Sequence, residues 1–456
     1  MSISTEKPLF EDVKSLTFSI KDIVENGKKE GTLVPHTQQY VKWKLNDFEY
    51  TDSGVKSSGA KAEHIKKLDW GWSHIQITEK IENSDLYKTL QNKITNSSKS
   101  YPFIVNNFVT KVGYYCLESE VINDTKLLEY AKRLTKEVNG EPMKTSAEIE
   151  LVGITLRSKS INISKFVNIR QTTLEDVETE TPEYWHRPLD EHVYPSAIMN
   201  LNAYEKIGID LQNEVEKTIV ILRLFKCGSI RWSKYRMHSE GFEPFSGGEL
   251  TAGRTYVLDT ALIQESEEEQ LKQFWSSIWD KIPNTFIHYG QDTNSFKDIA
   301  YQRFCDALLE IGPIERRILN AIMGLEGIFL RDKDEQQEMS YRLRMRIAKV
   351  IKFFGFEPFD VKRIVRDCYS IRSRFVHGGL LSHESKEDLE EKYGNINKLL
   401  IKLLNYLRIS LVVTVLMSPS KDEFISRIDN SFLDNNSEKK LEQALNPARH
   451  VFSLDR

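Results

Sequence analysis

The spacing of hydrophobic and polar positions changes near residue 290. Before that point, short runs rich in β-branched residues, with apolar and polar positions nearly alternating, predict strands at 148–169 and 217–237. The first 290 residues are otherwise rich in Lys, Asn, Ser and Thr, and no internal repeat is visible. The region 1–290 is therefore predicted to be an α+β, β-rich unit of one or two subdomains.

One segment of this region has a helical pattern. Residues 264–282 place Leu271, Trp275 and Trp279 on a single face, because these residues are four positions apart. The stretch that follows, 283–296, combines Pro, Gly, Asn and Asp and predicts a linker.

From residue 297 onward, apolar residues recur at intervals of three and four, which predicts helices throughout. The expected helices cover about 297–310, 314–329, 338–354, 360–377, 395–418 and 421–433. A polar loop rich in Glu and Lys is expected before the helix at 395. The region 297–456 is therefore predicted to be an all-α helical bundle, which makes the chain multidomain.

Composition bears on the cellular compartment of the protein and on its expected partners. The 456 residues carry a net charge of −4, so no global basic field points to nucleic acid. The N-terminus lacks the apolar core of a signal peptide, and the apolar run at 409–417 is too short to span a bilayer. No pair of the four cysteines has CxxC spacing, so neither a zinc site nor a disulfide framework is predicted. We expect a cytoplasmic protein with no membrane contact, no metal and no cofactor.

A local basic excess stands out against this background. Residues 341–374 contain ten basic and three acidic residues, which suits a polyanionic partner. The basic residues are Arg342, Arg344, Arg346, Lys349, Lys352, Lys362, Arg363, Arg366, Arg372 and Arg374.

The helix predicted at 360–377 ends at His377, since Gly378 and Gly379 permit a left-handed stop. Asp360 is its expected N-cap. Arg372 lies about 140° around this helix from His377 and roughly 7.5 Å along it, so the two side chains do not face each other. A second copy of the helix, or a turn of the chain end, would let both flank one phosphate.

These residue types suffice for RNA cleavage without a metal. A 2′-hydroxyl attacks the adjacent phosphorus, histidine moves the proton and arginine stabilises the phosphoryl oxygens. From the spacing alone, the simpler alternative is a histidine that caps the helix beside arginines paired with surface carboxylates. Both interpretations remain open on this motif.

Three blocks occur in order along the helical region: Gly324-Leu325-Glu326, Arg342/Arg344/Arg346-Ile347-Ala348, and Arg372 through His377. Together they resemble the Apea-like branch of the HEPN superfamily, over about 299–432. The resemblance implies a HEPN-like bundle and a metal-independent endoribonuclease, usually a homodimer in which two Arg/His helices meet. It implies Arg372 and His377 as the catalytic pair. Ser373 departs from the Asn, Asp or His of many HEPN nucleases, although the Apea-like branch often has Arg-Ser here.

The family also implies a biological setting. A large N-terminal region before such a bundle is found in members that act in anti-phage defence by abortive infection. RNA, with tRNA as one candidate, is then the expected partner, and a phage-derived trigger is expected for the N-terminal region. Some HEPN domains are inactive binding modules, so an RNA-binding and dimerisation module is the alternative.

Further residues are expected to support this site. Glu326 flanks an apolar stripe, where a carboxylate needs a partner; a salt bridge to Arg346 or Arg342 is one expectation, and orientation of Arg372 or His377 is the other. Asp367 and Ser373 are also expected to orient the site or to lie on the surface. The predicted RNA phosphate contacts are Arg374, Arg366, Arg346 and Arg342.

The N-terminal region offers weaker signals. His186 and His192, with acidic residues between them, match no trusted metal-ligand spacing. The segment 245–250 is a turn rather than a phosphate loop. Trp70 and Trp72 could stack a nucleobase but are expected to fill a core or an interface.

Overall fold

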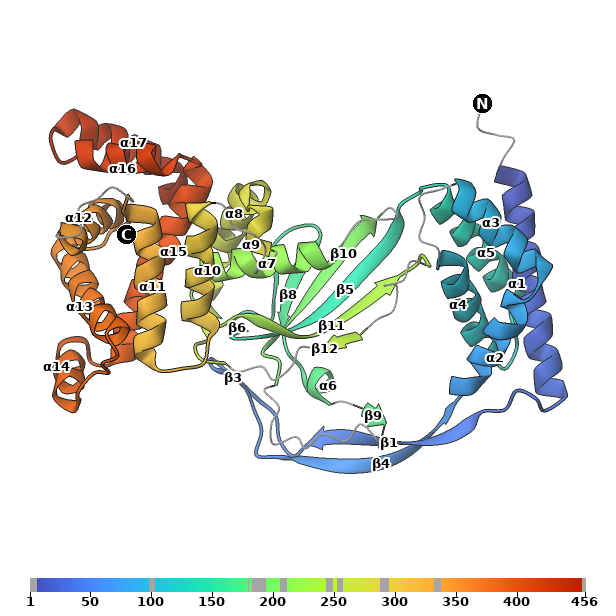
Figure 1. The fold of residues 1–456 in the computed structure, drawn as a ribbon. Coiled ribbons are helices and arrows are strands. Elements are labelled where there is room, and N and C mark those ends of the chain that lie inside the picture. The colour runs from blue at the N-terminus through green and yellow to red at the C-terminus, as the bar shows by residue number, and fades with distance from the viewer. Residues whose placement is uncertain are drawn as a thin grey trace.

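The computed structural model describes residues 6–97, 103–178, 180–182, 194–205, 211–242, 249–251, 257–287, 295–331 and 338–452. Figure 1 shows three parts along one molecule: a helical lobe, a central sheet with a long two-stranded ribbon, and a C-terminal bundle. The predicted order, a β-containing N-terminal region followed by a mostly helical one, is confirmed.

The helical lobe contains the first five helices, whose apolar faces meet in a core of their own. They are α1 (Glu6–Lys29), α2 (Gly71–Glu82), α3 (Asp85–Ser97), α4 (Ile104–Glu118) and α5 (Asp124–Val138). Leu16, Ile20 and Phe108 are fully buried there, and Phe242 joins them from a distant part of the chain. The sequence-based prediction of a β-rich region did not foresee this lobe.

A ribbon of two ten-residue antiparallel strands links the lobe to the rest of the molecule (Figure 1). It consists of β1 (His36–Leu45) and β4 (Ala60–Asp69), and the short β9 (Glu180–Pro182) pairs with β1. The hairpin β2 (Glu49–Thr51) and β3 (Gly54–Lys56) forms the tip of the ribbon. The tip docks on the central part of the molecule, because Leu156 N donates to Tyr50 Oη at 3.0 Å.

The central sheet has six antiparallel strands in the order β12-β11-β5-β10-β8-β7. Their bounds are β5 (Met143–Val152), β7 (Ser160–Asn162), β8 (Val167–Gln171), β10 (Ala197–Glu205), β11 (Arg231–Ser239) and β12 (Glu249–Thr251). A separate parallel pair joins β6 (Ile154–Leu156) and β13 (Ala261–Ile263), and α6 (Leu174–Val177) follows β8.

The strand predictions were confirmed in part. The segment 148–169 forms strands, but the first half of 217–237 belongs to helix α7 (Leu211–Phe225). The predicted helix 264–282 is α8 (Glu268–Ile278) with a 3-10 turn at each end, followed by α9 (Asn284–Ile287). Trp275 and Trp279 stack at 4.4 Å between ring centroids, as their shared face predicts.

Eight helices form the described part of the bundle. They are α10 (Phe296–Leu309), α11 (Ile314–Phe329), α12 (Met339–Ile351), α13 (Pro358–Val376), α14 (His383–Tyr393), α15 (Ile396–Met417), α16 (Lys421–Asn430) and α17 (Asn435–Val451). Six match the predicted segments within a few residues. The polar segment predicted as a loop is α14, and α17 was not predicted. Both are amphipathic or polar helices with few apolar residues, which weakens the periodic signal.

The sheet and the bundle share one hydrophobic core, which extends from Ala147 to Val451. Three arginines tie the two parts together. Arg231 of β11 donates to the carbonyl of Leu309, Arg317 of α11 bonds Asp259 at 2.8 Å, and Arg408 of α15 donates to the carbonyls that end α7. The composition changes near residue 290, but the core does not divide there.

Helix α15 explains the apolar run at 409–417. Its 22 residues have a mean hydropathy of 1.9 over the best window, long and apolar enough to cross a membrane. The expectation that the run was too short to span therefore underestimated this helix. However, 72% of that window is buried inside the bundle, where α15 packs against α10, α11 and α17. Its apolar character is accounted for by its place in the core.

Candidate functional site

Helix α13 begins and ends through local backbone contacts. Glu357 is the N-cap and accepts a hydrogen bond from Phe359 N at 3.1 Å, and Pro358 occupies the first turn. The predicted cap, Asp360, lies inside the helix and pairs with Arg363. At the other end, Gly378 N donates to Phe375 O and Gly379 N to Arg374 O, both at 3.0 Å.

This C-terminal pattern is a Schellman motif, which requires a left-handed residue after the cap. Gly378 supplies it with φ of +82°, and His377 is the C-cap. The prediction that α13 ends at His377 because of the glycine pair is confirmed. The carbonyls of the last turn are bonded by backbone N–H groups, so the His377 ring is not needed to close the helix.

The His377 ring is exposed, and none of the residues that the structure describes forms a hydrogen bond or ion pair with it. The simpler alternative, a histidine whose ring caps a carbonyl, is therefore not what this conformation has. An exposed imidazole at a helix end remains accessible to a ligand and can accept or donate a proton.

Arg372 points toward α11 instead of toward His377. Its Nη2 donates to Glu326 Oε2 at 3.4 Å, and its guanidinium lies 5.6 Å from the centre of the Tyr369 ring. The Nε atom of Arg372 is buried without a hydrogen-bond partner in the described part of the chain. Glu326 and Tyr369 thus hold the arginine on two sides, while its Nε–H group donates no hydrogen bond to a described residue.

Glu326 is the carboxylate that positions Arg372. Burial raises the pKa of Glu326, and the Arg372 guanidinium partly offsets that rise. The expected salt bridge from Glu326 to Arg346 or Arg342 is wrong, whereas the alternative, orientation of Arg372, agrees with the contact. Tyr369 was missed by the sequence analysis, although its position three residues before Arg372 on the same helix was a usable signal.

The block Gly324-Leu325-Glu326 has a separate packing role at each position. A Cβ at Gly324 would lie 2.7 Å from a terminal methyl group of Leu407, so a larger residue there would require the Leu407 side chain of α15 to shift. Leu325 is fully buried in the shared core. Glu326 extends from the next position toward α13. The three sequence blocks therefore lie on helices α11, α12 and α13, which contact each other.

Asp367 does not orient the proposed site. It accepts hydrogen bonds from Tyr393 Oη at 2.8 Å and from Arg366 Nε at 2.9 Å. The first contact fastens α14 to α13, and burial together with this hydrogen bond raises the pKa of Tyr393. Ser373 contributes its backbone carbonyl to His377 N at 3.3 Å, and its side chain has no hydrogen-bond partner among the described residues.

Most basic residues of the predicted patch pair with acidic residues, some on other elements and some on the same helix. Arg346 has a 5% exposed side chain, forms two bonds to Asp429 at 2.8 and 2.9 Å, and donates to the Phe329 carbonyl. It is a structural residue, so its predicted phosphate contact is wrong for this conformation. Arg342 pairs with Glu338 at 3.1 Å.

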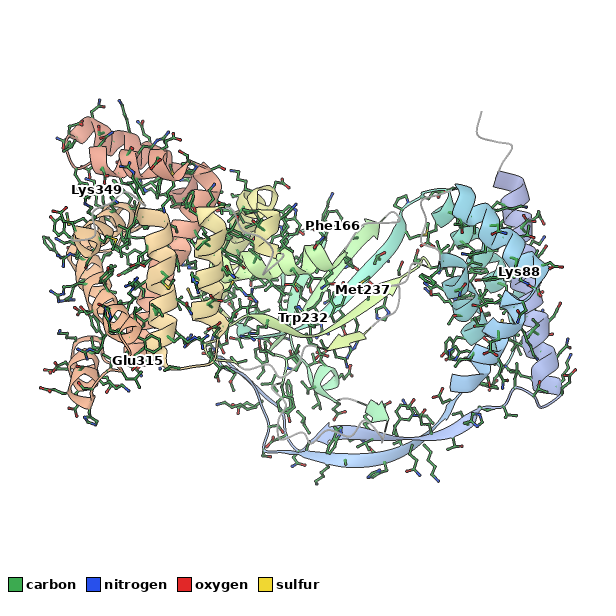
Figure 2. All side chains as sticks on the ribbon, viewed as in Figure 1. Lys88, Phe166, Trp232, Met237, Glu315 and Lys349 are labelled. Carbon is green, nitrogen blue, oxygen red and sulfur yellow. The ribbon has the colours of Figure 1, made fainter. Side chains whose placement is uncertain are left out.

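Other basic residues of the patch also pair with acids. Lys349, labelled in Figure 2, and Lys352 both pair with Glu438 of α17, whereas Arg366 pairs with Asp367, the next residue of its own helix. Arg374 differs, because its Nη1 donates to the hydroxyl of Ser385 at 3.0 Å rather than to a carboxylate. The excess counted along the sequence ignored acids that folding brings from α16 and α17, so Arg374 is the best-placed of the four predicted phosphate contacts.

The N-terminal candidates contribute little to this site. His186, His192 and residues 245–248 lie outside the described residues, as does the side chain of Trp72. Trp70 packs against the core of the helical lobe, and the Lys28 ammonium lies 5.3 Å from its ring, which agrees with a packing role. Within the described ranges, no group of three His, Cys, Asp or Glu side chains is placed to hold a metal ion.

In comparisons with known proteins, no protein-family model, curated protein or solved structure matches the chain.

Proposed function

We propose that the chain is a metal-independent endoribonuclease whose acting residues are His377 and Arg372. The observation that carries the proposal is the combination at the end of α13: an exposed histidine ring that no described residue bonds, and an arginine held by Glu326 whose Nε has no partner among the described residues. Histidine is suited to proton transfer near neutral pH, and arginine to phosphoryl oxygens.

The reaction follows from these groups. The 2′-hydroxyl of RNA loses its proton to an imidazole and forms a new bond to the adjacent phosphorus. The bond from phosphorus to the 5′-oxygen breaks, and that oxygen takes up a proton from an imidazolium. Arg372 donates to the phosphoryl oxygens as charge develops on them. The products are a 2′,3′-cyclic phosphate and a 5′-hydroxyl end.

A second copy of the chain supplies the missing geometry. Arg372 faces α11 and His377 faces solvent, so one α13 helix presents the pair on different sides. Val376 and Leu380, beside His377, are 53% and 62% exposed, which favours a partner surface at this end of the bundle. A homodimer through α13 would bring the His377 of one copy near the Arg372 of the other.

The biological role we propose is anti-phage defence by abortive infection in the cytoplasm, with the N-terminal region responding to a phage-derived trigger. This part rests on the resemblance to the Apea-like branch of the HEPN superfamily.

The alternative function is a binding and dimerisation module without turnover. The serine at position 373, in place of the Asn, Asp or His of many HEPN nucleases, favours it. Such a module would bind RNA through phosphate contacts that weaken steeply with salt, and it would leave the strand intact.

The test is cleavage of labelled total RNA and tRNA in EDTA by the full chain, beside His377→Ala and Arg372→Ala. We expect scission by the parent alone, with cyclic phosphate ends, and a loss of about 100-fold or more in each variant. Ser370→Ala is the control, since this exposed residue of α13 bonds only a backbone carbonyl of its own helix. Cleavage by a folded, dimeric His377→Ala at the parental rate would overturn the proposal.

A further inference from the structure

The β1–β4 ribbon is exposed on both faces. Of the twenty residues in its two strands, only Val41 is buried. A two-stranded ribbon without a buried face gains little stability from its own side chains. Its length and exposure therefore point to a role outside the core, and Figure 1 shows the two strands running between the helical lobe and the central sheet, with β9 beside β1.

The ribbon carries a positive excess in a chain whose net charge is −4. Its strands contain five lysines (Lys42, Lys44, Lys61, Lys66 and Lys67) and two acidic residues (Glu63 and Asp69). Glu180 of the neighbouring β9 approaches Lys42 at 3.9 Å and also contacts Lys67. Even with that residue, basic groups outnumber acidic ones in the two strands β1 and β4, whereas the tip between them adds no further basic excess.

Three of the five lysines, Lys42, Lys44 and Lys61, lie at the end of the ribbon next to β2 and β3. Lys44 and Lys61 lie directly opposite each other in the antiparallel register, so both point to the same face. Like charges in this position destabilise a strand pair. Lys44 pairs with Glu63 at 2.5 Å, but Lys61 has no acidic partner among the residues described, and neither has Lys66.

A hollow of about 560 Å³ lies at the same end, lined by Lys44, Leu45, Asn46, Lys61 and Glu63. Two lysines and one glutamate are among its lining residues, so an additional anion would relieve the repulsion between Lys44 and Lys61. Lys42 is two residues from Lys44 on the same face, about 7 Å away. Anions repeated along a chain would meet lysines in succession.

We propose that the β1–β4 ribbon binds the phosphate backbone of RNA, outside the site on α13. The preference for a repeated anion comes from the lysines and their register; the choice of RNA among polyanions rests on the proposed function. Lysine ammonium groups contact phosphates as point charges, so the binding is independent of base sequence.

The test uses the full chain carrying His377→Ala, so that RNA remains intact, and labelled oligouridine as the probe. Anisotropy titrations at several salt concentrations compare this protein with a version that also carries Lys42→Gln, Lys44→Gln and Lys61→Gln, the three lysines that share one face of the ribbon. The matched control replaces three exposed, unpaired lysines of the helical lobe with Gln: Lys80, Lys126 and Lys132.

We expect the ribbon variant to bind more weakly and its slope of log affinity against log salt to fall by about 2, since each single-strand phosphate contact contributes about 0.7. The control should keep the parental slope. Equal slopes for the parent and the ribbon variant, or an equal loss in the control, would overturn the proposal.

Two further outcomes are informative. Lysines on an edge strand such as β4 also prevent pairing with other chains. A ribbon variant that self-associates while it keeps parental RNA affinity would assign them that role and overturn the inference, as would displacement of RNA by polyglutamate at equal charge. Binding that depends on the ribbon without any cleavage by the parent would leave the inference intact and contradict the proposed nuclease.

Discussion

The helical lobe and the sheet–bundle body differ in how their cores are built. The lobe buries its own five helices around Phe108 and receives one side chain from outside, Phe242. The body has one core in which strands near residue 149 and helices near residue 445 pack together, and three buried or half-buried arginines cross between them. The sheet and the bundle therefore form one core, although their composition suggests two separate domains.

This difference teaches where the chain divides. A change from α+β to all-α composition at 290 falls inside a continuous core, while the division between the two cores falls near residue 142, where α5 leads into β5. Segments with similar amino-acid composition do not always pack together, because a core forms wherever apolar faces meet.

Truncating the chain is expected to have the largest effect on the cooperativity of unfolding. Residues 143–456 keep the whole shared core and should unfold cooperatively. Residues 295–456 lose Asp259, the partner of Arg317, and Phe286, whose ring stacks on Tyr301 at 4.1 Å. Both arginine and aromatic partners are then missing, so this fragment should show no cooperative transition in urea, followed by circular dichroism. A cooperative 295–456 would show that the bundle is an independent domain.

Phe242→Ala should have a smaller effect, which destabilises the lobe and leaves the body unchanged. Phe242 is fully buried against Phe108, its N–H donates to Glu137 at 2.7 Å, and its carbonyl accepts from Asn107 at 3.0 Å. Loss of the ring should cost about 3 kcal/mol in the lobe.

Amide hydrogen exchange measures this change region by region. Protection should fall in α4 and α5 and stay constant in α11 and α15. Phe103→Ala, at a 59% exposed position of the same lobe, is the matched control. An equal loss of protection in both regions would mean that the lobe and the body unfold as one.

Glu326→Gln should have the smallest effect and depends on pH. Burial raises the folded-state pKa of Glu326 above 4.5, so the stability contributed by its protonated form is fully present below the unfolded pKa and is lost as pH rises through the folded value. The Gln variant lacks this change.

The free energy of unfolding of the parent, relative to Glu326→Gln, should therefore decrease as pH rises from below 4.5 toward neutrality. Urea titrations across that range measure it. Asp124→Asn removes an exposed carboxylate 2.7 Å from Lys21 in the lobe and should change stability by less than about 1 kcal/mol. A parent-minus-Gln difference that is constant with pH would contradict the expected sign.

Sequence patterns predicted the parts of the fold that depend on local periodicity. Helix α13 and its end at His377 follow from apolar spacing and from two glycines, and both were predictable. The lobe was not, because its helices carry many Lys, Asn and Thr residues that weaken the apolar signal. The pairing of Arg346 with Asp429 was also out of reach, since these residues are 83 positions apart and nothing local links them.

The candidate site shows the same difference between local features, which the sequence predicts, and contacts between distant residues, which it does not. The residue types at 372 and 377 were evident from the sequence, whereas the choice of Glu326 for Arg372 required the contact between α11 and α13. The basic excess counted along the chain is smaller in space, because acids of α16 and α17 pair with Arg346, Lys349 and Lys352; that it binds a polyanion stays a prediction.

The ribbon has a consequence for how the molecule responds to a protease. The chain crosses between the lobe and the body through β1, then through β4, and a third time through the short link from α5 to β5; the segment after β11 also brings Phe242 to the lobe core. A single cut at the ribbon tip, between β2 and β3, leaves α1 packed in the lobe core and leaves the later segments attached through the third passage. Such a nicked protein would run as two bands on a denaturing gel and as one species on a sizing column.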